Sequence, residues 1–160
     1  MAETKIKRSK FALFLDTTPA TTPTWSLIGT GFTTAMVNYN PEVTTEGYIH
    51  QDNKTATVES YAPTIQIEGK AINEEAVFEF IDNLRRTRAV GSAAETDILM
   101  VYEYETPVST DQYPAELQPV SIAIESYGGD AATTLQHSFT IHFRGDATTG
   151  LYDVSGNSFA

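Results

Sequence analysis

The sequence predicts a mainly β protein, a β-sandwich or partly rolled barrel with one flanking α-helix. Three observations predict this class. About eight to ten short segments alternate apolar and polar residues, or lie between turn formers, as strands do. Residues 74–88 instead place apolar side chains at helical spacing. Residues 38–63 form a long, polar, Thr-rich stretch that suits an extended hairpin or arm.

The chain length and composition fit one domain over residues 1–160, because 160 residues that are 41% hydrophobic can bury a substantial core. A basic arm at residues 1–10 and a C-terminal tail at residues 150–160 are expected at its ends. There is no cysteine, which excludes disulfide bonds, thiolate chemistry and cysteine-based zinc sites.

The charge is strongly uneven along the chain. The net charge is −11, but four of the ten basic residues and one of the 21 acids lie in the first ten positions. The chain after Lys10 therefore carries 20 acids against 6 bases. This balance argues against nucleic-acid binding, which needs clustered lysine and arginine.

The basic N-terminus precedes a short apolar run, which superficially suggests a signal peptide. That run is only five residues long, from Phe11 to Leu15, whereas a secretory apolar region needs about 7 to 15. No stretch approaches the roughly 20 apolar residues of a membrane span. We therefore expect a soluble, unsecreted protein that does not associate with membranes.

Residues 11–15, 25–28 and 32–39 predict the first three strands, separated by a proline-containing loop and a glycine turn. In the arm, residues 55–60 alternate with the period of a strand. An arm that packs on a neighbouring subunit would show β propensity without a hydrophobic face of its own. A surface loop is the alternative.

Several signals predict the helix. Asn73 is the expected N-cap, Glu74 and Glu75 follow at the positive end of the dipole, and Gly91 is the expected left-handed stop. The stripe expected to pack against a sheet consists of Val77, Phe78, Phe80, Ile81 and Leu84.

The remaining strands follow the same period-two rule. Residues 64–68 alternate, and residues 97–105 are apolar on both sides at their start, which predicts a central strand. Residues 120–125 and 135–143 alternate most clearly, with a glycine-containing turn between them. Residues 151–154 suggest a last short strand.

Residues suited to catalysis are few. His137 and His142 are five positions apart and should point to opposite faces of one strand, so no metal-ligand set forms. We expect His137 to be a hydrogen-bonded core residue. Glu103 and Glu105 would lie on one strand face at a spacing that a glycosidase could use, but exposed acids at this spacing are common. The sequence predicts no catalytic, cofactor-binding or metal-binding residue.

Four segments, taken in order, resemble the major tail tube proteins of long-tailed, siphovirus-type bacteriophages. They are Tyr48-Ile49-His50-Gln51-Asp52-Asn53-Lys54-Thr55, Thr64-Ile65-Gln66-Ile67-Glu68-Gly69, the helix at 74–88, and Asp97-Ile98-Leu99-Met100-Val101-Tyr102. The resemblance covers nearly the whole chain. It implies a β-sandwich or barrel with a flanking helix, shared with the inner tubes of contractile tails and of type VI secretion.

The resemblance also implies a function. Such subunits are structural virion proteins that assemble into stacked hexameric rings, and the resulting tail tube conducts DNA without binding it specifically. The implied partners are copies of the chain itself and the tape measure, tail terminator and tail-tip proteins. The implied location is the phage tail, assembled in the cytoplasm of the host bacterium. No enzyme activity and no cofactor are implied.

Site residues follow from this implied role. The arm at 38–63 is the candidate for stacking, with inter-ring contacts from Tyr48, His50, Asp52 and Lys54. An acidic bore would repel DNA phosphates over a Debye length of about 8 Å. The candidates for lining it are first Glu59 and Glu68, on the polar sides of neighbouring strands, and then Glu103 and Glu125. The basic arm is a candidate for pairing with an acidic surface of an adjacent subunit.

Two alternatives come from other functional classes. A carbohydrate-binding or adhesive β-sandwich module would use Tyr39, Tyr48, Tyr102 and Tyr104 as stacking platforms. A hydrolase would use Glu103 and Glu105. Within the tail proteins, the inner tube of a contractile tail is the other option.

Overall fold

The computed structural model describes residues 3–160, so the first two residues of the expected basic arm lie outside the described residues. Two short 3-10 helices, Arg8–Lys10 and Gly91–Ala94, accompany the regular elements. These elements are β1 (Phe11–Asp16), β2 (Trp25–Leu27), β3 (Phe32–Asn38), β4 (Pro41–Glu46), β5 (Thr55–Tyr61), β6 (Thr64–Lys70), α1 (Ala76–Thr87), β7 (Glu95–Tyr102), β8 (Gln112–Gly128), β9 (Gln136–Phe143), β10 (Thr148–Asp153) and β11 (Ser158–Phe159).

Nine of the strands form one antiparallel sheet in the order β2-β1-β7-β8-β9-β6-β3, with β10 and β11 attached beside β8. The sheet curls along β8, which is 17 residues long and pairs with β10 over its first half and with β9 over its second half. Strands β2 and β3 stand at the two ends of the order, so the sheet is sandwich-like and does not close into a barrel. The predicted fold class is confirmed.

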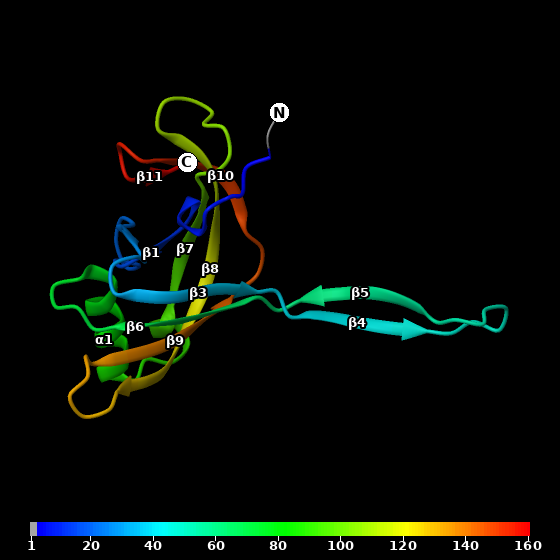
Figure 1. The fold of residues 1–160 in the computed structure, drawn as a ribbon, viewed down its shortest axis with the longest axis horizontal. Coiled ribbons are helices and arrows are strands. Elements are labelled where there is room, and N and C mark those ends of the chain that lie inside the picture. The colour runs from blue at the N-terminus through cyan, green and yellow to red at the C-terminus, as the bar shows by residue number, and fades with distance from the viewer. Residues whose placement is uncertain (1–2) are drawn as a thin grey trace.

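The main core lies inside the curl, between the β1-β7 part of the sheet and the β8-β9-β6 part, with α1 covering one side (Figure 1). Ile98 and Met100 of β7 meet Ile67 of β6 and Phe139 of β9 in this core. A second cluster occupies the other face of β7, where Leu99 and Val101 pack with residues of β1, β2, β8 and β10. Because β7 is buried on both faces between β1 and β8, the prediction of a central strand is confirmed.

The helix packs three side chains, Val77, Ile81 and Leu84, into the main core, and Phe80 is half-buried at its margin. Phe78 is half-buried as well and lies against the His137 ring. Its predicted ends were wrong. Glu75 is the N-cap, and its carboxylate accepts the Phe78 N–H at 2.7 Å. The reason is a turn just before the helix in which Glu74 has a φ of 65°, so Asn73 lies too early to cap.

The C-terminal end of the helix also differs from the prediction. Arg88, with φ 48° and ψ 53°, takes the left-handed stop conformation, and its N–H bonds to the carbonyls of Leu84 and Arg85. Gly91 has a positive φ as well, but it begins the second 3-10 helix. The left-handed stop therefore comes at Arg88, three positions before the glycine that the sequence favoured.

His137 lies in the core among aromatic rings and is 5% exposed. Its ring contacts Phe32, Phe78 and Phe139, with ring centroids 5.2 to 6.2 Å away. Neither ring nitrogen has a hydrogen-bond partner among the described residues. The expectation of a hydrogen-bonded histidine was wrong, because the ring packs against three phenylalanine rings.

The burial of His137 predicts a pH-dependent stability. Burial lowers the pKa of His137 from 6.5, opposed by the Lys70 backbone and the carboxylates of Glu75 and Asp82. Below pH 6.5 the unfolded chain therefore binds a proton that the folded chain excludes. We expect the free energy of unfolding to fall, relative to a His137→Phe variant, by up to about 1.4 kcal/mol per pH unit below 6.5. Urea denaturation of both proteins between pH 5 and 8 measures this, and parallel pH profiles would contradict it.

Candidate assembly surfaces

Strands β4 and β5 form a separate two-stranded hairpin that projects from the body (Figure 1). We call residues Pro41–Tyr61 the arm. Every residue of both strands is exposed. The Asn40 side chain fixes the base of the arm by donating hydrogen bonds to the Ala62 carbonyl at 3.0 Å and to the Thr64 hydroxyl at 3.2 Å. The predicted hairpin is confirmed, and it buries almost nothing against its own subunit.

The arm has two chemically different faces, because residues directly opposite in an antiparallel pair point to the same side. Val43 lies opposite Val58, and Pro41 lies opposite Tyr61, which gives an apolar face. Glu42 lies opposite Ser60, and Glu46 lies opposite Thr55 on the other side. A register shift after Glu42 lets Glu59 join this acidic face, where it accepts a hydrogen bond from Thr44.

The apolar face of the arm is open to solvent in the subunit. Val43 is 51% exposed, Val58 50% and Tyr61 60%. An isolated two-stranded hairpin is marginally stable in water, and an exposed apolar patch commonly marks a protein interaction site. The arm therefore has the properties of a segment that packs on another protein surface.

The four predicted inter-ring residues all lie in the loop at the far end of the arm. Tyr48 donates to Glu46 at 2.7 Å and stacks on His50, with ring centroids 6.3 Å apart. Asp52 and Lys54 lie on the returning side of the loop. Ile49, whose side chain is fully exposed between Tyr48 and His50, was not among the predicted contacts. An isoleucine in an otherwise polar loop was the signal that could have identified it.

A second surface is the outer face of the second half of the sheet, formed by β3, β6, β9 and the end of β8. We call it the polar face. It consists of side chains that point away from the main core, in three cross-strand rows: Thr34, Glu68, Ser138 and Ser126; Met36, Gln66, Thr140 and Ala123; Asn38, Thr64, His142 and Ser121. Hydroxyl and amide groups therefore dominate it.

Two of the four predicted lining residues lie on the polar face. Glu68 is exposed in the middle of β6, and Glu125 sits where a bulge interrupts the pairing of β8 with β9. The carboxylate of Glu125 accepts a hydrogen bond from Thr140 at 2.6 Å, which directs it to the same side. The structure thus brings Glu68 and Glu125 onto one surface.

The other two predicted lining residues lie elsewhere. Glu59 belongs to the arm, and the expectation that it shares neighbouring strands with Glu68 was wrong, because β5 pairs only with β4. Glu103 follows the end of β7 in a turn closed by the Glu105 N–H bonding to the Tyr102 carbonyl. The hydrolase alternative required Glu103 and Glu105 to lie on one strand face, and they do not.

Tyr48 lies apart from the other three tyrosines of the carbohydrate-binding alternative. Burial raises the pKa of Tyr102, and Tyr39 and Tyr104 are both close enough to raise it further. Tyr48 is at the far end of the arm, and Tyr39 packs edge-on against Tyr61 at its base. Tyr102 is half-buried between Phe11 and Tyr104. The four rings do not form one exposed platform.

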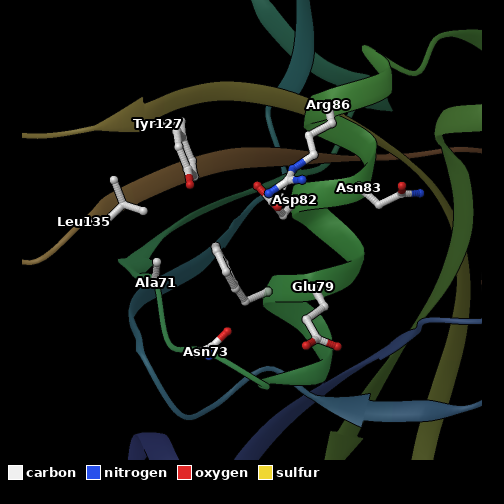
Figure 2. Close-up of a pocket in the computed structure, with 9 residues that line it drawn as sticks. Ala71, Asn73, Glu79, Asp82, Asn83, Arg86, Tyr127 and Leu135 are labelled. Carbon is white, nitrogen blue, oxygen red and sulfur yellow. Dashed lines mark ion pairs between the residues drawn. The ribbon is translucent and has the colours of Figure 1, made fainter.

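A hollow of about 550 Å³ lies between α1 and the end of the sheet where β8 turns into β9 (Figure 2). Asp82 accepts from Arg86 at 2.9 Å and from Arg85 at 2.8 Å, and the hydrogen bond from Arg85 is the main cause that lowers the pKa of Asp82. Arg85 also lies over the Tyr127 ring at 3.8 Å. These contacts join the helix to β8, so the charged groups here hold the helix in place.

None of the helices within residues 3–160 is long and apolar enough to cross a membrane.

The comparisons with known proteins identify a fold. No family model matches the chain, and no curated protein matches it. Among solved structures, the chain is similar to one described as the tail of an empty GTA particle, computed with helical refinement and C6 symmetry. The TM-score is 0.65 at 11% sequence identity, over 90% of this chain and 98% of that chain. The similarity shows a shared fold, as the resemblance noted from the sequence implied.

Proposed function

We propose that this chain is the structural subunit of a phage-like tail tube, which assembles into stacked rings of six copies. The observation that supports it best is the shared fold over 90% of the chain with a protein of a C6-symmetric tail. The arm supports it independently, since it exposes an apolar face and buries almost nothing in its own subunit.

The geometry suits two kinds of contact. A ring needs a heterologous contact that closes, whereas a tube needs a second contact that repeats without closing. Strand β3 pairs with β6 on one side only, so its other edge is open to a neighbour within the ring. The arm extends from the end of β3 and reaches beyond the body, which suits the contact between rings (Figure 1).

The polar face is our candidate for the wall of the bore. It offers hydroxyl and amide groups with two carboxylates, Glu68 and Glu125, and six copies would bring twelve carboxylates to each ring. Carboxylates within a Debye length of about 8 Å repel DNA phosphates and keep the DNA from adhering. Glu59 and Glu103 lie off this face and are not part of the proposed wall.

The wider role follows from the same proposal. The tube conducts DNA during delivery. It acts as a structural conduit, without catalysis or a cofactor. The tape measure, tail terminator and tail-tip proteins are the proposed partners, and the tail of the virion is the proposed location, after assembly in the host cytoplasm.

Electron microscopy of the purified, concentrated protein tests the proposal. We expect rings or tubes with a central hole and six-fold end-on views in negative stain, and a matching large species in sedimentation velocity. A protein that stays monomeric at all concentrations, even when mixed with the other tail proteins of its particle, would contradict the proposal.

A further inference from the structure

Among residues 3–160, β4 pairs only with β5, so no strand of the described chain lies beside the outer edge of β4. Its backbone N–H and C=O groups along that edge can therefore accept a third strand. The β5 edge suits this less well, since the register shift at Glu59 distorts it. A strand added beside β4 would meet both faces of the arm at once, the apolar face with Val43 and the acidic face with Glu42 and Glu46.

Residues 3–7 have the complementary pattern. This segment, Glu3-Thr4-Lys5-Ile6-Lys7, is exposed throughout, and Lys7 has extended backbone angles of −78° and 144°. As a strand, it would place Lys5 and Lys7 on one side and Thr4 and Ile6 on the other. Ile6 is 64% exposed, and within residues 3–160 neither lysine forms an ion pair.

The charges of the two segments are opposite as well. Residues 3–10 carry four bases and one acid, which gives +3, and the arm carries four acids and one base, which gives −3. Lysines beside Glu42 and Glu46 would neutralise the acidic face while Ile6 covers Val43. The charges and the apolar positions therefore favour the same arrangement. The lysine side of residues 3–7 meets the acidic face of the arm, and the Ile6 side meets its apolar face.

The segment is fixed to its own body just after this stretch. Arg8 donates to the Phe11 carbonyl at 2.6 Å and to the Ala35 carbonyl of β3 at 3.0 Å. Figure 1 shows residues 3–7, in dark blue, and the arm of the same subunit extending in different directions. A segment held in this way does not reach its own arm, so the matching strand must come from another copy.

We propose that residues 3–7 of one subunit add as a third, outer strand to β4 in the arm of a neighbouring subunit. Lys5 and Lys7 lie over Glu42 and Glu46, and Ile6 lies beside Val43. The inference rests on the proposed tube, because it needs neighbouring copies. It goes beyond the proposed tube because it names the segment of a neighbouring subunit that binds the arm.

Cysteine cross-linking tests the contact directly, because the natural chain has no cysteine. One population carries Ile6→Cys and the other Val43→Cys; the two are mixed, assembled and oxidised. We expect a disulfide-linked dimer on a non-reducing gel, which can form only between subunits. The matched control is Ile6→Cys with Thr44→Cys, which points to the other face and should give little dimer. Equal yields in the two pairs, or none in either, would overturn the proposal.

Charge exchange tests the electrostatic part. We expect Lys5→Glu with Lys7→Glu, or Glu42→Lys with Glu46→Lys, to raise the concentration needed for assembly by about tenfold, since weak ion pairs are repeated in every subunit of a ring. The fourfold variant restores the natural net charge and should assemble nearly as the wild type does. Glu103→Lys with Glu105→Lys is the control for net charge and should have little effect.

The outcomes separate the two proposals. If the wild type forms tubes and the exchanged charges neither impair nor rescue assembly, the third strand is wrong and the tube stands. If the fourfold variant is worse than either double variant, the pairing is also wrong. If the wild type forms no rings or tubes, both proposals fail together.

Discussion

A chain without the arm is expected to fold normally and to form no tubes. The variant replaces Pro41–Tyr61 with a single glycine, so that Asn40-Gly connects Tyr39 to Ala62. Those two residues are already joined by a backbone hydrogen bond of 3.2 Å. Asn-Gly is the preferred turn for a two-residue hairpin, so β3 and β6 keep their pairing.

The expected stability follows from the exposure of the arm. Its strands bury no residue, so their removal costs the core nothing, and we expect the free energy of unfolding to change by no more than about 0.5 kcal/mol. Assembly instead loses both the apolar face and the acidic face of the arm. We expect a monomer or single rings in sedimentation velocity and no tubes in negative stain.

A variant with an intact arm provides the control for this deletion. Thr57→Ala changes one exposed residue on the acidic face without touching Val43, Val58 or the carboxylates, and it should still form tubes. Tubes of normal length from the shortened chain would show that stacking does not depend on the arm. Loss of the folded state would instead show that the arm stabilises its own subunit.

The fold was predictable where local patterns determine it. Period-two alternation located β9, and apolar residues on both sides identified β7 as an interior strand. The helix ends were missed because capping depends on backbone angles, such as those of Glu74 and Arg88, that residue type does not specify. The first half of β8 was missed because Pro114 and Pro119 argue against a strand, yet both lie within it.

The candidate site was harder to predict, because it depends on which distant strands pair. Glu68 and Glu125 share a face only because β9 lies between β6 and β8. Nothing in the residues around Glu59 distinguishes it from Glu68, since both alternate within a strand. The difference is that β5 turns back on β4, whereas β6 joins the main sheet.

Reversing the charge of the polar face should convert a repellent bore into one that retains DNA. Glu68→Lys with Glu125→Lys adds four positive charges to each subunit, or about 24 to a ring of six. Lysines along a bore neutralise phosphates and release counterions, so binding should be strong at about 50 mM salt and weaken steeply by about 200 mM. We expect assembled variant tubes to bind duplex DNA and to protect it from nuclease, whereas wild-type tubes do neither.

The position of the charge, rather than its amount, decides this result. Glu103→Lys with Glu105→Lys adds the same charge in the turn after β7, away from the polar face and away from the arm. DNA bound by those tubes should remain open to nuclease. Glu68→Gln with Glu125→Gln removes the repulsion without adding attraction, so protection should stay low. Protection that is equal in the two lysine variants would place the bore wall elsewhere, because then Glu68 and Glu125 would be no closer to the DNA than Glu103 and Glu105.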